Sequence, residues 1–140
     1  MIDIENDIFT TVATALRAKY PGIYVAGENI EVPPSFPAVT VVESDNHILQ
    51  KMRTLKIENA VEVMYTVNVF SDKVNGKKAE AKAIADVVDS TLEKAGFTRT
   101  LREQIPNAYD ASIFRMVMRY EAIIGAGATA GTYLVYQSGT

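Results

Sequence analysis

The hydrophobic residues between positions 58 and 96 change their spacing once, and this change separates a strand from a helix. From residue 61 to residue 70, valines and Tyr65 recur at every second position, which places them on one face of a strand. Asn75-Gly76 then supplies residues that tolerate positive φ, and Gly96 suits the left-handed position that ends a helix. Between them, apolar residues recur at helical spacing: Ala79, Ala83, Ile84, Val87, Val88 and Leu92. We therefore predict a central strand followed by a helix over 77–95 that packs on a sheet.

The same periodicities predict the elements on either side. Ile4, Ile8, Val12 and Leu16 form the apolar stripe of an N-terminal helix that Asp3 is placed to cap. Short strands are predicted at 23–26, 38–43 and 97–102, and the prolines at 33, 34 and 37 favour an extended connection. Residues 112–124 alternate again. One face of this strand carries Phe114, Met116, Met118, Tyr120 and Ala122, and the other carries Arg115, Val117, Arg119 and Glu121.

These elements predict an α+β fold with a mostly antiparallel sheet of four or five strands and two helices packed on one face. Residues 1–124 form the single predicted domain, and residues 125–140 form a flexible linker and a strand-like C-terminal arm. No internal repeat is present in the 140 residues.

Two segments do not follow either periodicity. Residues 44–59 are a long excursion that contains apolar residues, and they form either a projecting functional segment or a bent extension of the two flanking strands. Residues 125–131 contain only Gly, Ala and Thr, and an apolar segment, Tyr133-Leu134-Val135-Tyr136, follows them. We predict that this segment adds to a neighbouring subunit, because an apolar strand without a partner invites pairing. The alternatives are a disordered tail and a strand folded back on its own sheet.

Composition limits the function classes. With 48% hydrophobic and 22% charged residues, the chain suits one globular domain, and the absence of cysteine excludes disulfides, thiolate metal sites and cysteine nucleophiles. The acidic first residues and the lack of a long apolar run predict a cytoplasmic origin and no membrane span. The net charge of −3 argues against nucleic-acid binding by the whole surface.

No constellation predicts catalysis, a cofactor or a metal. The glycines of 125–131 have the spacing GxGxxxG and no following helix, so a linker is favoured over a nucleotide loop. His47 is the only histidine, and it suits a surface loop better than a metal site. Asp86 and Asp89 share a helix face with lysines, which is typical of a solvated surface. Arg115 and Arg119, together with Arg99 and Arg102, form either a basic stripe on the sheet or ordinary solubilising charges.

Several of these motifs resemble one known family. They are Val67-Asn68-Val69-Phe70-Ser71-Asp72, residues 75–84 from Asn75-Gly76 onward, Val87-Val88-Asp89, Gly96-Phe97-Thr98-Arg99, and residues 115–122 with their aromatic and arginine alternation. In these motifs the chain is similar, up to Ile124, to the tail-terminator or tail-completion proteins of long-tailed bacteriophages and prophages, particularly those of Gram-positive hosts.

The resemblance implies a structural virion-assembly protein without an active site. It would form a homo-oligomeric ring, usually of six, at the head-proximal end of the tail tube, end tube growth and offer the surface to which the head docks. Its partners would be itself, the tail tube protein and head-tail connector proteins, with DNA only in passage and no membrane; it would be found in the virion tail, after assembly in the host cytoplasm. The predicted contacts are His47, Leu49, Met52, Arg53, Leu55, Arg115, Arg119, Tyr133, Leu134 and Tyr136. A head-side connector or stopper is the first alternative, and a small-ligand binding or enzymatic domain is the alternative of another class.

Overall fold

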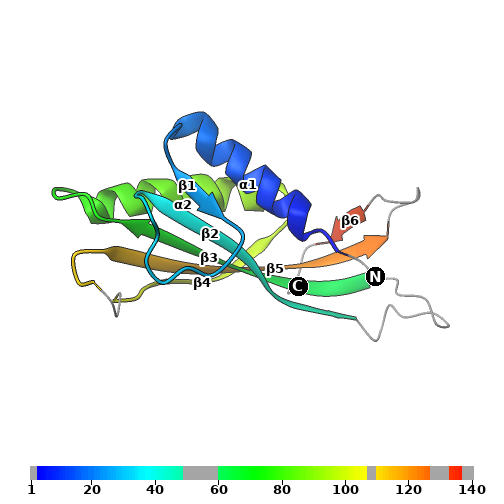
Figure 1. Ribbon diagram of the computed structural model, residues 1–140. Helices are drawn as coiled ribbons and strands as arrows, with labels where there is room; N and C mark the ends of the chain where they lie inside the picture. Colours follow the sequence, from blue (N-terminus) through cyan, green and yellow to red (C-terminus); the bar gives the residue numbers. More distant parts are fainter. Residues whose placement is uncertain (1–2, 49–59, 107–109, 127–132, 137–140) are drawn as a thin grey trace.

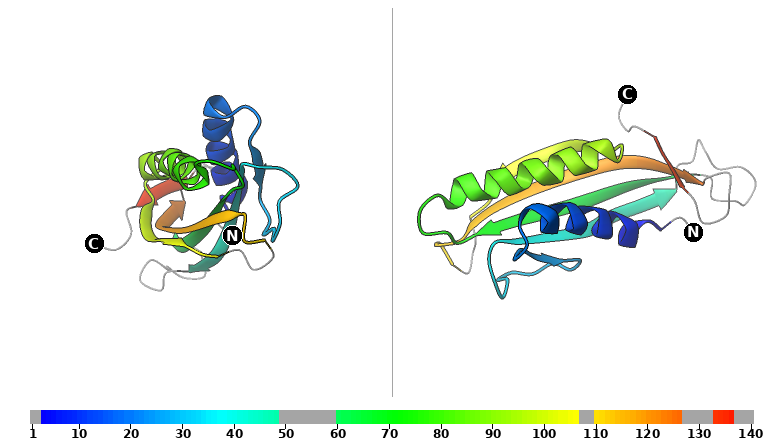
Figure 2. Two further views of the ribbon diagram at one scale, coloured as in Figure 1. Left: turned by 90° about the vertical axis from the view of Figure 1, so that its left-hand side faces the viewer. Right: turned by 90° about the horizontal axis from the view of Figure 1, so that it is seen from above.

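Two helices lie on one face of a twisted sheet in the computed structural model of the chain (Figure 1). The structure describes residues 3–48, 60–106, 110–126 and 133–136. Helix α1 (Glu5–Lys19) and helix α2 (Lys77–Lys94) pack against each other and run lengthwise over the sheet, as the view from above shows (Figure 2).

The sheet has the strand order β1-β2-β3-β5-β4, with a sixth strand, β6, paired to β5. The strands are β1 (Tyr24–Ala26), β2 (Ala38–Ile48), β3 (Ala60–Ser71), β4 (Thr98–Gln104), β5 (Phe114–Ala126) and β6 (Tyr133–Tyr136). All pairs are antiparallel except β1 with β2. The predicted α+β class, the mostly antiparallel sheet and the central place of residues 61–70 are confirmed.

The main core lies between the helices and the sheet. Every second residue of β3 faces the helices, and Tyr65 meets the ring of Phe97 edge-on with the ring centroids 5.5 Å apart. The same alternation in β5 buries the predicted residues from Phe114 to Ala122 in this core. A second, smaller apolar cluster is separate from the main core. It consists of the buried residues Ala38, Phe70 and Ile113, against which Tyr24 and Phe36 pack.

Glycines mark both ends of α2, as the sequence predicts. Gly76 precedes the helix with φ 94°, and Gly96 follows it with φ 95°. The Gly96 N–H donates to the Glu93 carbonyl at 3.0 Å, and the Phe97 N–H donates to the Leu92 carbonyl at 2.9 Å. These are the two hydrogen bonds of a Schellman motif, and they bring Phe97 back onto the core.

Three details of the prediction are wrong. Gly125 and Ala126, predicted as the start of the linker, belong to β5 and pair with β6. The stripe of α2 that faces the sheet contains Ala81 and Ala85, whereas Ala79 and Ala83 are exposed. Strand β2 does not end at Glu43 but continues to Ile48, after a bulge between Glu43 and Asp45. Residues 44–48 therefore extend the flanking strand, which is the alternative interpretation of that segment, and residues 49–59 lie outside the described residues.

Candidate functional site

The surface available to a partner is the face of the sheet that the helices leave open, which we call the outer face. It consists of the alternate residues of β3 and β5 that point away from the helices: Glu62, Met64, Thr66, Asn68, Phe70, Arg115, Val117, Arg119, Glu121 and Ile123. Asn68, Phe70 and Val117 are buried, so the other residues form its accessible part. Arg119 is exposed there, opposite Thr66 on β3 and Leu101 on β4. Arg119 thus presents a charge at the middle of this face.

Arg115 lies on the same face but is held by its own chain. Its Nε donates to Asn68 Oδ1 at 3.0 Å, and its guanidinium carbon lies 5.7 Å from the centre of the Phe70 ring. This side chain packs over buried residues and completes a hydrogen bond to one of them. Of the two arginines predicted to contact a partner, Arg119 is the one that projects from the sheet.

The four arginines do not form one stripe, which was one of the two interpretations, because they lie on opposite faces of the sheet. Arg99 and Arg102 stand opposite Tyr120 and Met118 in the register of β4 and β5, on the helix side. Arg99 lies 3.6 Å from Asp89, and Arg102 lies 3.5 Å from Asp86, both on α2. The sequence gives the spacing of these residues but not the bulge between Arg99 and Leu101, which shifts the register of β4.

Asp89 has a second role that the sequence analysis missed. It accepts a hydrogen bond of 2.8 Å from the hydroxyl of Tyr120, whose side chain is buried in the core. Burial, and then this bond to a carboxylate, raise the pKa of Tyr120 above its usual range. Asp89 is therefore a partner of the core rather than only a solvated helix residue.

The extended ends of β2 and β3, residues 44–48 and 60–64, form what we call the β2–β3 arm. Ser44 Oγ donates to the Met64 carbonyl at 3.2 Å and accepts from Thr66 Oγ1 at 3.0 Å, which fixes the bulge. His47 is exposed and lies 3.2 Å from Asp45 through its Nδ1 atom. The other predicted contacts of this segment, Leu49, Met52, Arg53 and Leu55, lie outside the described residues.

Glu5 and Glu43 join the N-terminal end of α1 to β2. The Glu43 N–H donates to Glu5 Oε2 at 2.9 Å, and the Tyr65 hydroxyl lies 3.4 Å from Glu43 Oε2. Burial raises the pKa of Glu43, and the neighbouring carboxylates Glu5 and Asp3 add to this rise, although hydrogen bonds from Asn46 and Tyr65 oppose it.

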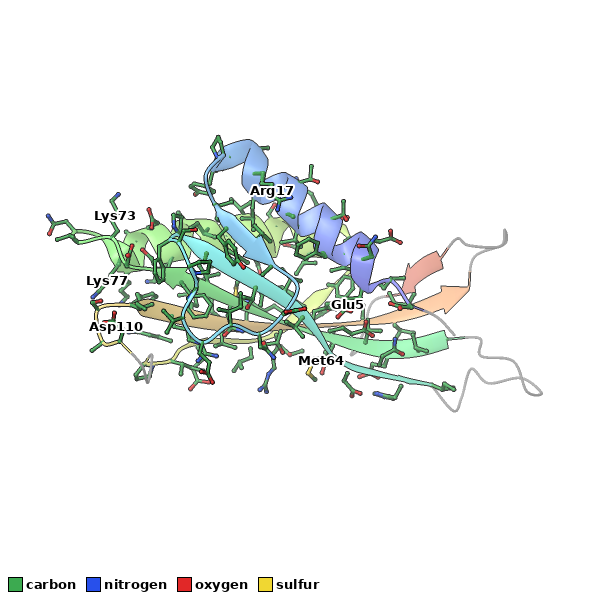
Figure 3. The ribbon with its side chains drawn as sticks, viewed as in Figure 1. Glu5, Arg17, Met64, Lys73, Lys77 and Asp110 are labelled. Atoms are coloured by element: carbon green, nitrogen blue, oxygen red, sulfur yellow. The ribbon has the colours of Figure 1, made fainter. Side chains whose placement is uncertain are left out.

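Charges of both signs gather at one end of the molecule, where Asp72, Glu80 and Asp110 accompany three lysines. Lys73, Lys77 and Lys78 lie around the turn between β3 and α2, and Figure 3 shows Lys73 and Lys77 at one end with Glu5 toward the other. The tip of this turn carries Val74, whose side chain is 94% exposed. The sequence shows that Val74 lies in a turn but not that it is almost fully exposed, so Val74 is not among the predicted contacts.

A hollow of about 260 Å³ between α2 and β4 is lined by Asp89, Glu93, Phe97, Thr98, Arg99 and Tyr120. Asp89 accepts the Tyr120 hydroxyl bond and lies 3.6 Å from Arg99, so these three polar groups already interact with one another. Within the described ranges, no group of three His, Asp or Glu side chains is arranged to hold a metal. None of the described helices is long and apolar enough to cross a bilayer.

The C-terminal contacts Tyr133, Leu134 and Tyr136 belong to β6, which pairs antiparallel with β5 in the chain. The register places Tyr136 opposite Ile123 and Leu134 opposite Gly125. In the single chain the segment therefore folds back on its own sheet.

The chain is similar to parts of two solved structures. A chain of the virion of a native gene transfer agent particle is 14% identical, with a TM-score of 0.62, over 85% of this chain and 92% of that chain. A chain from the cryo-EM structure of an extracellular contractile injection system, the PVC sheath/tube terminator in the extended state, is 12% identical. Its TM-score is 0.49, and the match covers 100% of this chain and 63% of that one. At these identities the likeness is one of fold. No curated protein sequence matches the chain significantly.

A family model, described as tail completion protein gp17, matches residues 8–125. The match spans nearly all of α1 and every element from β1 to β5, and it leaves out only the ends of the chain. It confirms the resemblance inferred from the strand-turn-helix motif and the arginine-bearing strand. The chain therefore belongs to the tail completion protein gp17 family, and its role is a structural one in completing a tail.

Proposed function

We propose that the protein caps the head-proximal end of a phage tail tube as a ring, ends tube growth and presents the surface to which the head docks. The observation that carries this proposal is the family match, which covers both helices and the five main strands as one unit. The ring is a hexamer of identical subunits, and its other partners are the tail tube protein and the head-tail connector proteins. The protein acts in the virion tail after assembly in the host cytoplasm, and no step of this role requires catalysis.

A closed ring needs two different patches on each subunit that fit each other with a rotation that closes. The middle of the outer face and the β2–β3 arm supply candidate patches, and the two meet where Glu62 and Met64 belong to both. We assign Arg119, His47 and the predicted residues Leu49, Met52, Arg53 and Leu55 to these contacts. Arg115 lies over Phe70 and bonds to Asn68 on the same face, and it is assigned to the edge of the contact beside Arg119.

A cap must distinguish its two neighbours, which shape and charge at its two rims can do. The net charge of −3 leaves DNA free to pass, because a surface that does not neutralise phosphates does not retain the duplex.

A head-side connector or stopper is the runner-up, since it shares small size and ring assembly. Copurification separates the two roles: the proposed cap is recovered with tails that lack heads, whereas a connector is recovered with filled heads that lack tails. The small-ligand alternative is less favoured, because Asp89, Arg99 and Tyr120 in the hollow are engaged with one another.

The test is electron microscopy of purified tail tubes mixed with the protein and with two charge-reversal variants. The unaltered protein is expected to form rings at one end of each tube and to stop further tube growth. Arg119→Glu on the outer face should abolish end binding, whereas Lys82→Glu on the exposed side of α2 should leave it intact. Tubes that elongate equally with and without the protein would refute the capping role.

A further inference from the structure

One edge of β5 is shared by two separate strands. β4 pairs with β5 from Gln104 opposite Met116 to Thr98 opposite Glu121. β6 pairs with the same edge of β5 from two residues further along, with Tyr136 opposite Ile123 and Tyr133 opposite Ala126. The same edge therefore has one segment filled from the body of the domain and one filled by the last strand of the chain.

β6 is bound to the sheet only through β5. Its pairing involves four residues of each strand, and β5 is the one strand it pairs with in the described chain. A two-stranded contact of this length is marginal by itself in water. The backbone groups of residues 123–126 on β5 nevertheless need a strand beside them, because the unpaired edge of a sheet is a template for another strand.

The connection between β5 and β6 is residues 127–132, and these six residues are only Gly, Ala and Thr. Six residues span at most about 20 Å when extended, which exceeds the spacing of adjacent strands several times. This length suffices to reach the chain's own β5, and it suffices to reach the same edge of an adjoining copy where that edge lies within about 20 Å of Ala126.

We propose that in the assembled ring each β6 leaves its own subunit and pairs with residues 123–126 of β5 in the adjacent subunit; this rests on the ring formation proposed above. The register and the backbone hydrogen bonds are the same in both arrangements, so the exchange gives up no pairing of the free chain. In the ring, the neighbouring edge is held at a high effective concentration, and each exchanged strand ties one subunit to the next. β6 thus acts as a strap between subunits.

Introduced cysteines test the exchange directly, because the natural chain has none. In Ile123→Cys/Tyr136→Cys, the two thiols face each other in register. Rings bound to tail tubes are oxidised mildly and run on a denaturing gel without reductant. If β6 is exchanged, the disulfides join subunits and give a ladder up to the full ring; if β6 folds back, each disulfide closes within a chain and only monomers appear.

Thr98→Cys/Glu121→Cys is the matched control, since this pair lies on the same edge of β5 but on the domain's own β4. It should give cross-linked monomers in every case. Monomers from the Ile123/Tyr136 pair, or no disulfide where the control forms one, overturn the exchange and leave the capping role standing. If the unaltered protein forms no rings with tubes at all, the capping role fails first, and the exchange fails with it.

Discussion

Tyr120 shows how a single hydroxyl decides which helix residues contribute to stability. Its ring is buried between α2 and β5, and its hydroxyl bonds to Asp89 at 2.8 Å and to Met118 Sδ at 3.4 Å. The sulfur is a weak acceptor, so Asp89 is the partner that satisfies this group. Helical spacing groups Asp89 with Asp86 as two solvated acids, but only one of them reaches the core.

We therefore predict unequal losses when the two acids are removed. Asp89→Ala should lower the free energy of unfolding by about 1–3 kcal/mol, because it leaves the Tyr120 hydroxyl without a good acceptor. Asp86→Ala should cost less than about 1 kcal/mol, because its carboxylate is 72% exposed and pairs with Arg102 at the surface. Urea unfolding of the three proteins measures both losses, and equal values would show that the Tyr120 bond contributes nothing.

Glu43 predicts a specific dependence of stability on pH. Burial raises its pKa above that of the unfolded chain, so the folded state favours the protonated form. This contribution is present in full below the unfolded pKa and is lost as pH rises through the folded pKa. Glu43→Gln keeps an oxygen for the Tyr65 hydroxyl and removes the titration.

The variant should accordingly gain stability relative to the natural protein as pH increases from about 4 to 7. Thermal midpoints of both proteins across this interval measure the gain. A difference between the two midpoints that stays constant with pH would contradict the prediction.

At the scale of the element, α2 is anchored by its buried stripe. Leu92 is fully buried against the sheet, whereas Lys82 is exposed. Leu92→Ala should cost about 2–5 kcal/mol through lost burial and the cavity that remains. Lys82→Ala should change stability by less than about 0.5 kcal/mol. Chemical denaturation provides the comparison, and similar losses from the two changes would mean that the helix is rotated relative to the sheet.

The strand-turn-helix unit could be predicted from sequence because independent signals agree there. Alternation identifies β3 and β5 and the faces they bury, and Gly76 and Gly96 mark the helix ends by backbone conformation alone. The rotation of α2 was partly wrong because alanines occur on both of its sides, and alanine gives little hydrophobic contrast. The continuation of β2 was missed because residues 44–46 are polar and a bulge interrupts their alternation.

The candidate site was less predictable than the fold. Whether two arginines share a surface depends on strand order and register, which are set by pairing across the whole sheet. The alternation of residues correctly placed Arg115 and Arg119 on one face. Only the fold shows that Arg115 is held by Asn68 and Phe70, whereas Arg119 projects from the sheet. The register of β4 with β5 likewise places Arg99 and Arg102 on the helix side, which the sequence alone does not show.

At the scale of the whole molecule, the β2–β3 arm should be separable from the stability of the domain. Ile48 lies opposite Val61 at the end of the arm, so an Asn-Gly turn can replace residues 49–60 and close a tight hairpin. The replacement keeps both helices and the core residues Val61 and Val63, and of the described residues it removes only Ala60 at the end of β3. The shortened protein should therefore keep its thermal midpoint within a few degrees but lose binding to tail tubes. Calorimetry measures the thermal midpoint, and cosedimentation with tail tubes measures the binding. A shortened protein that still binds would remove residues 49–59 from the interface, and one that unfolds would place them in the core.

The bond between Glu5 and the Glu43 N–H has a consequence for how copies of the chain meet in a crowded cell. Beyond Thr40, β2 pairs with a strand on one side only within the described residues, so its other side is the kind of edge on which aggregates and fibres nucleate. The carboxylate of Glu5, at the start of α1, occupies one donor of that edge, and the bulge at Ser44 bends the strand just beyond it. A stray strand would have to displace a charged acceptor and follow a kinked backbone, so this edge resists sheet-to-sheet aggregation.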